Sequence, residues 1–247
     1  MLPLKAVTHS LKVFKTLLLD YRYFASVQGH ALTDKDGYIP WFTFPAIEAL
    51  KNWNLSARRV FEYGSGYSTL FWAANTAQVI SVEHNPEWHE RISSLLPVNA
   101  RIILAPITQG DNEHEPLPQT RSQFARYAES IKDQNDLFDI IVIDGYSRSR
   151  VRHQCAQVSL PHLSHHGMMI VDNSDWLPAT CLYLRRAGLI QIDFSGFVPG
   201  NPHTQTTSFF LTAKFNFEHR QKIIPVGGTG YNWERALESQ LLGNKGH

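Results

Sequence analysis

The sequence has few cysteines, almost no excess charge and no long apolar run. Cys155 and Cys181 are the only cysteines in 247 residues, which excludes a disulfide framework and a zinc site built from cysteines. The 23 basic and 22 acidic side chains give a formal net charge of +1, so no long-range field attracts nucleic acid or an anionic membrane. No apolar run is long enough to span a bilayer. These absences predict a protein of a reducing compartment, with neither nucleic acid nor a membrane as its partner.

The N-terminal segment is partly apolar, but lysines interrupt it. Lys5, Lys12 and Lys15 break the run and no small-residue cleavage site follows, so we expect no signal peptide and a cytoplasmic protein. Apolar residues recur at helical spacing over residues 4–27, which predicts an amphipathic helix. With the aromatic loop that follows, this helix makes a predicted N-terminal cap over residues 1–54. The cap serves either as a dimer contact, giving a homodimer, or as a lid over a substrate.

Strand and helix patterns alternate from residue 58 onward. The apolar runs suit strands buried on both faces of a parallel sheet. They are RRVFEY, QVISVE, ARIILA, FDIIVID, GMMIVD and LIQIDF. Repeated β-α units give a doubly wound sheet, and the last run with TTSFFLTAKF predicts an antiparallel pair at one edge. We therefore predict an α/β fold with a mostly parallel, seven-stranded sheet over residues 55–215, followed by a C-terminal tail over residues 216–247.

The stretch VFEYGSGYST, residues 60–69, contains a glycine turn of the kind that passes close to a ligand. Gly64 and Gly66 follow an apolar run, and glycines let the backbone turn sharply and approach a bound group. A phosphate-binding loop needs a lysine and a hydroxyl residue after the glycines, and this sequence has none. A dinucleotide fingerprint places a third glycine where Thr69 stands. The remaining alternatives are a ligand without phosphate, or a tight connection that binds nothing.

Two acids favour a ligand that carries positive charge. Glu62 ends the first strand candidate, where a pyrophosphate would bring negative charge close. S-adenosylmethionine has an ammonium, a sulfonium and no phosphate. Glu83 ends the next strand candidate, 19 residues after Gly64, and an acid there can accept hydrogen bonds from both ribose hydroxyls. A dehydrogenase that binds NADH is the poorer alternative, because Glu62 and Thr69 both oppose it.

The residues VFEYGSGYSTLFWA and VISVEHNP resemble motif I and the next acidic strand end of class I S-adenosylmethionine-dependent methyltransferases. The resemblance covers about residues 55–215 and implies the Rossmann-like methyltransferase fold. It implies that four residues line the methionine side of the cofactor, namely Glu62, Gly64, Gly66 and Ser68. It also implies that Glu83 holds the ribose.

Two later strand candidates end in oxygen-bearing side chains. Asp144 ends one, and Asp172 with Asn173 ends the other; two acids and an amide suit an oxygen-only Mg²⁺ site. The arrangement resembles the metal-dependent catechol O-methyltransferases, which ligate Mg²⁺ through an Asp after strand four and an Asp-Asn after strand five. Acids at such strand ends also hold the cofactor's amino group, as we expect of Asp144, or cap the following helix. A site with Mg²⁺ and a site without metal therefore both stay open.

The sequence departs from that family at the general base. The family has a lysine three residues beyond the first aspartate, and here Ser147 stands at that position. The arginines that follow stay protonated and are poor bases; they either hold an anionic substrate or form a solvated helix face. We therefore predict Asp144 and His203 as the catalytic residues. Asp175 and His153 are the alternatives for accepting a proton.

These features together predict an enzyme. The leading hypothesis is an S-adenosylmethionine-dependent methyltransferase that acts on an oxygen of a small molecule or glycan. Catalysis then consists mainly of aligning the acceptor with the activated methyl group and removing its proton. The alternatives are a catalytically inactive scaffold that binds the same cofactor, and an aminopropyltransferase of the same fold.

Overall fold

The computed structural model describes most of the predicted sheet domain and little of its flanks. The described residues are Leu11, Lys15, 33–34, 37–107, 124–146, 149–201 and 203–220. Apart from Leu11 and Lys15, the predicted helix over residues 4–27 lies outside the described residues, as does the tail from residue 221. Within the described part, no helix is long and apolar enough to cross a membrane.

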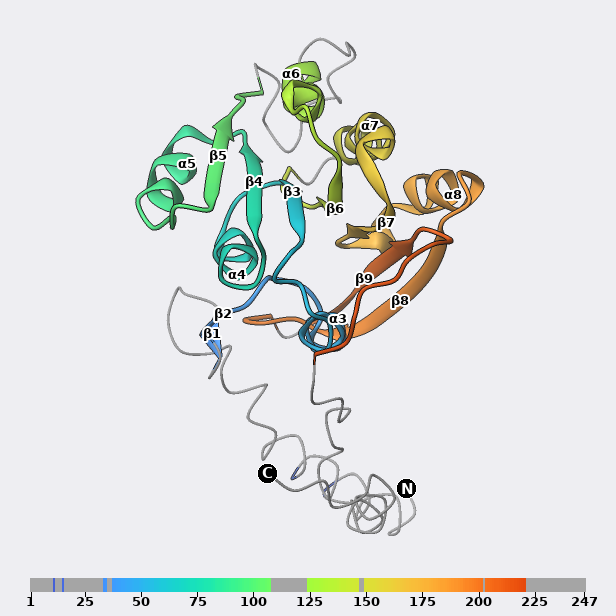
Figure 1. Ribbon diagram of the computed structural model, residues 1–247. Coiled ribbons are helices and arrows are strands. Elements are labelled where there is room, and N and C mark those ends of the chain that lie inside the picture. The colour runs from blue at the N-terminus through green and yellow to red at the C-terminus, as the bar shows by residue number, and fades with distance from the viewer. Residues whose placement is uncertain are drawn as a thin grey trace, which may run out of the picture.

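A seven-stranded sheet forms the centre of the fold (Figure 1). Its strands are β3 (Arg59–Tyr63), β4 (Gln78–Glu83), β5 (Ala100–Leu104), β6 (Phe138–Ile143), β7 (Leu163–Val171), β8 (Ile190–Phe197) and β9 (Thr204–Leu211). The strand order is β5-β4-β3-β6-β7-β9-β8. The strands from β5 to β7 pair in parallel, whereas β9 runs antiparallel to both β7 and β8. The predicted α/β fold, with its antiparallel pair at one edge, is confirmed.

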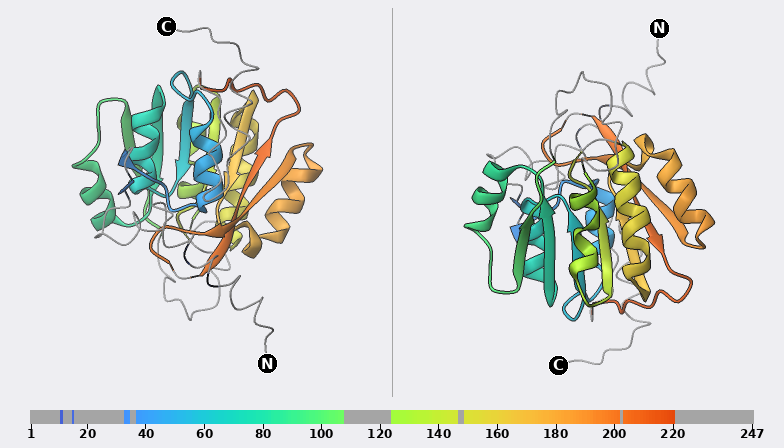
Figure 2. Two further views of the ribbon diagram at one scale, coloured as in Figure 1. Left: turned by 90° about the horizontal axis from the view of Figure 1, so that it is seen from below. Right: turned by 90° about the horizontal axis from the view of Figure 1, so that it is seen from above.

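Helices cover both faces of the sheet. They are α3 (Phe44–Lys51), α4 (Tyr67–Asn75), α5 (Pro86–Ser93), α6 (Ala125–Glu129), α7 (Ser149–Ser159) and α8 (Pro178–Arg186), with the short 3₁₀ turns η2 (Ser130–Asp133), η3 (Leu160–His162) and η4 (Ser174–Trp176). Helices α3 and α4 lie on one face, and α6, α7 and α8 lie on the other (Figure 2). The predicted N-terminal loop also contains a small hairpin, β1 (Thr33–Asp34) with β2 (Gly37–Tyr38).

Alternating side chains of the central strands divide the core in two. On β6, Ile141 and Ile143 pack in the core beneath α6, α7 and α8, whereas Ile140 and Val142 pack in the core beneath α3 and α4. Successive strand residues point to opposite faces, and both faces here are buried, which explains the near-continuous apolar runs of the sequence. The two cores hold the strands in register, so that the loops at their carboxyl ends meet at one edge.

Candidate functional site

A cleft of about 510 Å³ opens at the carboxyl ends of the central strands. Gly64 follows β3, Asp144 follows β6 and Asp172 follows β7, and all three line the cleft. The other predicted site residues on its wall are Ser68, Asn173 and His203. The lining residues that the sequence prediction did not name as site residues are Trp41, Ser65, Trp88, Gly145, Arg152, Trp176, Asn201 and Gln205. Glu62, Gly66 and Glu83 lie near the cleft but are not part of its lining.

The two glycines of the turn have different roles. Gly64 has a φ of 93°, and a Cβ atom added to it would lie 2.3 Å from the Cα of Gly145. Gly145 in turn has a φ of 68°, and its added Cβ would lie 2.6 Å from the Cα of Gly64. The turns that follow the neighbouring strands β3 and β6 therefore pack backbone against backbone. At Gly66 an added Cβ would meet only Trp88, at 3.9 Å, so the space before helix α4 stays open for a ligand.

Glu62 lies behind the turn and does not reach the cleft wall. Its side chain is fully buried, and its Oε2 atom accepts hydrogen bonds from Thr69 Oγ1 and Ser81 Oγ, both at 2.6 Å. Thr69 Oγ1 also accepts a hydrogen bond from the Gly66 N–H at 3.0 Å. Thr69, at the position of a dinucleotide fingerprint's third glycine, therefore ties the turn to Glu62. Burial raises the pKa of Glu62 to about 7, because the charged form loses its hydration.

Glu83 is held as a fixed acceptor at the end of β4. Its Oε2 atom accepts hydrogen bonds from the N–H and the hydroxyl of Ser65, at 3.0 and 2.9 Å. Its Oε1 atom accepts from the N–H groups of His84 and Asn85, at 2.9 and 2.8 Å. Burial alone would raise the pKa of Glu83, but hydrogen bonds from His84, Asn85 and Ser65 together lower it. Glu83 is 3% exposed and each of its oxygens already accepts two hydrogen bonds, so ribose hydroxyls would have to replace the bonds from Ser65.

The guanidinium of Arg152, on α7, occupies the position predicted for a metal ion. It donates to Asp144 Oδ1 and Asn173 Oδ1, both at 3.0 Å, and to the carbonyl oxygen of Asp172 at 2.9 Å. Two of the predicted ligating side chains are thus bound to a cation that belongs to the protein. Within the described residues, no group of three or more His, Cys, Asp or Glu side chains could hold a metal ion. The residues present do not fit Mg²⁺ at this position. The metal site predicted at Asp144, Asp172 and Asn173 stays a prediction that the geometry does not favour.

Asp172 is a buried acid with a raised pKa. Its carboxylate accepts hydrogen bonds from Thr207 Oγ1 at 2.6 Å and from Gln205 Nε2 at 3.1 Å. Burial, together with the charge of Asp144, nevertheless raises the pKa of Asp172 to about 8. Burial also raises the pKa of Asp144, which the nearby Arg152 opposes. Near neutral pH, Asp172 therefore carries its proton.

Two exposed aromatic side chains line the cleft. Trp41 is 53% exposed and Trp176 is 57% exposed, and both line the cleft together with His203. Trp176 follows the predicted Asp172 and Asn173 in the stretch DNSDW, residues 172–176, and this closeness in sequence was the signal for it. The two alternative proton acceptors do not line the cleft: Asp175 Oδ1 accepts from the Thr206 N–H at 3.1 Å, and His153 lies between α7 and α8.

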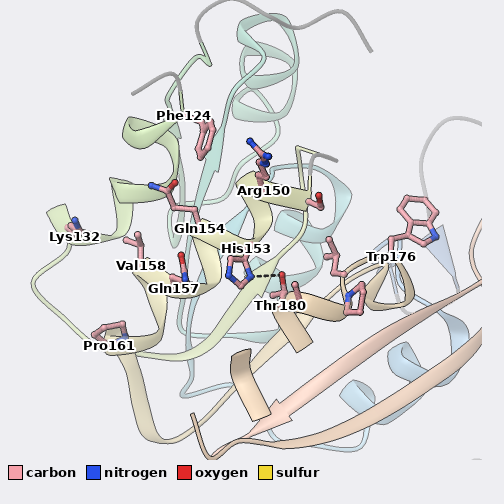
Figure 3. A pocket seen from close by; sticks show the side chains of 14 residues that line it. Phe124, Lys132, Arg150, His153, Gln154, Gln157, Val158, Pro161, Trp176 and Thr180 are labelled. Carbon is pink, nitrogen blue, oxygen red and sulfur yellow. Dashed lines mark hydrogen bonds between the residues drawn. The ribbon is translucent and has the colours of Figure 1, made fainter. Parts of the chain in front are cut away.

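A second, larger cavity of about 920 Å³ adjoins the cleft (Figure 3). It is a groove between α7 and α8, and Trp176 belongs to the walls of both cavities. His153 Nδ1 lies 3.1 Å from Thr180 Oγ1 across the groove, and burial lowers the pKa of His153. Arg150 and Gln154 also line this groove, which gives it a cation and an amide beside apolar walls.

Residues 61–174 match the family model described as a methyltransferase domain. The match begins in β3, spans the glycine turn and Glu83, and ends in η4, so it contains most of the cleft. The chain carries a class I methyltransferase domain. It is an S-adenosylmethionine-dependent enzyme, and the resemblance stated from motif I and the acidic strand end is confirmed.

Solved structures of methyltransferases share the general arrangement at low identity. An rRNA methylase from Streptococcus thermophilus is 14% identical with a TM-score of 0.44, covering 70% of this chain and 97% of its own. The N-methyltransferase NodS from Bradyrhizobium japonicum is 10% identical with a TM-score of 0.45, covering 64% and 86%. Precorrin-6y C5,15-methyltransferase from Geobacter metallireducens is 11% identical with a TM-score of 0.49, covering 74% and 94%. No curated protein matches the chain. Likenesses this distant do not indicate the methyl acceptor of this methyltransferase.

Proposed function

We propose that this methyltransferase transfers the methyl group of S-adenosylmethionine to an oxygen atom of a small molecule or sugar. The observation that supports this acceptor class is the pair of exposed indoles, Trp41 and Trp176, on a cleft whose inner wall carries acids. Indole faces pack well against flat rings and present little charge. An acceptor ring bound against these indoles would place its hydroxyl in the same cleft as the carboxyl groups of Asp144 and Asp172.

The cofactor's place follows from the glycine turn and Glu83. S-adenosylmethionine supplies a methyl group already activated on a sulfonium, so the protein contributes alignment and proton removal. We assign the ribose hydroxyls to Glu83 and the cofactor's approach to the turn to Gly66, where an added Cβ would meet only Trp88 at 3.9 Å. Ser68 and Asp144 both line the cleft, and we assign them to the methionine side of the cofactor. Because Glu62 is fully buried, we assign it the support of the turn through Thr69 and not a direct contact with the cofactor.

Asp144 and His203 are the groups we assign to proton removal. Both line the cleft, and Asp144 is oriented by its contact with Arg152 at 3.0 Å. Asp172 is less suited to this role near neutral pH, because its raised pKa of about 8 keeps it protonated. A protonated Asp172 can instead donate a hydrogen bond toward the acceptor oxygen.

Calorimetric titration with S-adenosylhomocysteine tests the cofactor assignment. We expect binding that does not depend on Mg²⁺, and no binding of NADH. Glu83→Gln replaces a charged acceptor by a neutral one and is expected to weaken binding about tenfold, since hydrogen bonds to charged groups contribute roughly 1.5–3 kcal/mol. The control is Glu87→Gln, which changes an exposed glutamate on α5. Equal affinities of the Glu83→Gln variant and the unchanged protein would remove Glu83 from the cofactor site.

The acceptor is sought with S-adenosylmethionine labelled on its methyl group. We expect label to enter hydroxylated ring compounds, phenols or sugars, and not RNA; label in RNA or on nitrogen would contradict the proposal.

With the acceptor identified, Trp176→Ala is expected to lower kcat/KM at least tenfold while leaving the affinity for S-adenosylhomocysteine unchanged. Because Trp176 also walls the groove of Figure 3, the loss should grow with the length of the acceptor. Leu182→Ala, at an exposed leucine of α8, is the control.

A further inference from the structure

The Arg152 side chain uses every hydrogen-bond donor that it has. A guanidinium carries five N–H donors in one plane. Three of them bind the loop that follows β6: Nη2 donates to Asp144 Oδ1 and to the carbonyl of Gly145, both at 3.0 Å, and Nε donates to the carbonyl of Tyr146 at 3.2 Å. Arg152 therefore fixes both the acid and the turn that packs on Gly64.

The remaining two donors bind the residues that follow β7. Nη1 donates to the carbonyl oxygen of Asp172 at 2.9 Å and to Asn173 Oδ1 at 3.0 Å. Asn173 has a φ of 50°, and it is the one non-glycine residue with positive φ in the described part of the chain. Asparagine tolerates this left-handed conformation, which here directs its side-chain oxygen at the guanidinium. One buried cation thus joins two adjacent strand ends, and 4% of Arg152 is exposed.

The oxygen atoms around the Arg152 guanidinium have the arrangement of a cation site, and the guanidinium fills it. Asp144 and Asp172 lie on the same cleft as Arg152, and the guanidinium forms an ion pair with Asp144 at 3.0 Å. The acceptors of Arg152 are all oxygen atoms, the type that hard divalent cations bind. An arginine side chain is part of the protein and cannot leave as a metal ion can.

We propose that Arg152 is a positioning residue that permanently fills the cation site of the cleft, so that this methyltransferase works without a divalent metal. This inference rests on the proposed function for its effect on the cofactor, but the cation site itself is testable without any acceptor. The fixed guanidinium orients Asp144 and the Gly145 turn toward the cofactor.

Removing the guanidinium while keeping the oxygens should convert the position into a metal site. In the Arg152→Ala variant we expect MnCl₂ to raise Tm and to bind with a stoichiometry of one by calorimetry, because a ligand of the native state stabilises it. The unchanged protein should bind no Mn²⁺, and neither should a variant that carries both Arg152→Ala and Asp144→Asn. Arg186→Ala, at an exposed arginine of α8, serves as the control for loss of an arginine.

Chemical rescue separates a positioning role from a purely structural one. Millimolar guanidinium chloride should restore S-adenosylhomocysteine binding to the Arg152→Ala variant, and it should leave the unchanged protein unaffected. Absence of both Mn²⁺ binding and guanidinium rescue in a folded Arg152→Ala protein would overturn the inference. Failure of the unchanged protein to bind S-adenosylhomocysteine would count against the proposed function. Mn²⁺ binding to the Arg152→Ala variant would then still test whether Arg152 fills a cation site.

A lysine variant covers the case in which Arg152→Ala does not fold. Arg152→Lys keeps the charge, but its single ammonium cannot make the planar fork. We expect it to fold, to bind no Mn²⁺ and to bind S-adenosylhomocysteine at least tenfold more weakly than the unchanged protein. Unchanged affinity in Arg152→Lys would show that charge alone is needed and would overturn the positioning role.

Discussion

Replacing Gly64 by alanine is expected to lower the free energy of unfolding by about 3 kcal/mol or more and to abolish S-adenosylhomocysteine binding. An L-residue in the left-handed region costs roughly 1–2 kcal/mol, and Gly64 has a φ of 93°. Its new Cβ would also lie 2.3 Å from the Cα of Gly145. Because backbone cannot rotate away as a side chain can, the β3 and β6 turns would have to separate, at a further cost of about 1–3 kcal/mol. Urea unfolding and calorimetry measure both effects.

Gly66→Ala is the matched control, since it adds the same methyl group two residues away. Its φ of 170° is extended backbone, and the nearest atoms to the new Cβ belong to Trp88 at 3.9 Å. We expect a change in unfolding free energy within about 0.5 kcal/mol. If the cofactor passes close to Gly66, this variant should still bind S-adenosylhomocysteine more weakly. A Gly64→Ala protein as stable as Gly66→Ala would contradict the backbone packing described for the two turns.

Glu62→Gln is expected to become more stable relative to the unchanged protein as pH rises from 5 to 8. Burial raises the pKa of Glu62 from 4.5 to about 7, so between these values the folded state binds more protons than the unfolded state. Stability then falls with rising pH, and the glutamine variant lacks this loss. One pKa unit corresponds to about 1.4 kcal/mol, so the stability difference should change by about 3 kcal/mol across the window. Urea unfolding at several pH values measures it.

The informative quantity is how the difference in unfolding free energy between Glu62→Gln and the unchanged protein changes with pH. The glutamine amide also destabilises the folded protein by an amount that does not depend on pH. Its NH₂ group would stand where Glu62 Oε1 has no partner among the described residues, and an unpaired buried donor costs about 1–3 kcal/mol at every pH. Glu83→Gln is the control, because the pKa of Glu83 is lowered and not raised. Here the unchanged protein should lose stability relative to the variant as pH falls, and this change should occur below pH 4.5. A stability difference for Glu62→Gln that does not vary between pH 5 and 8 would mean that Glu62 is ionised in the folded protein.

The sequence alone predicted the sheet and the edge at which the site lies. Apolar runs occur where β3, β4, β5, β6 and β7 were found. The inner strands β3, β4 and β6 are buried on both faces, which removes alternation, whereas β5 at the sheet edge is only partly buried. The glycine and acids that follow those runs, Gly64, Asp144 and Asp172, are local signals. Since carboxyl ends of parallel strands share one edge, these signals were enough to place six predicted site residues on one cleft.

Only the tertiary structure decided what those residues contact. Strand order brings β3 beside β6, and so Gly64 meets Gly145, which the chain order does not reveal. The same order sets Arg152 between the loops after β6 and β7, where it binds the side-chain oxygens of Asp144 and Asn173, two of the three side chains that the sequence assigned to a metal. Glu62 was predicted on the cofactor side, but its place beneath the turn depends on Thr69 and Ser81 from other elements. Local patterns determine which segments are strands and turns, whereas partners distant in sequence depend on how the packed layers bring those segments together.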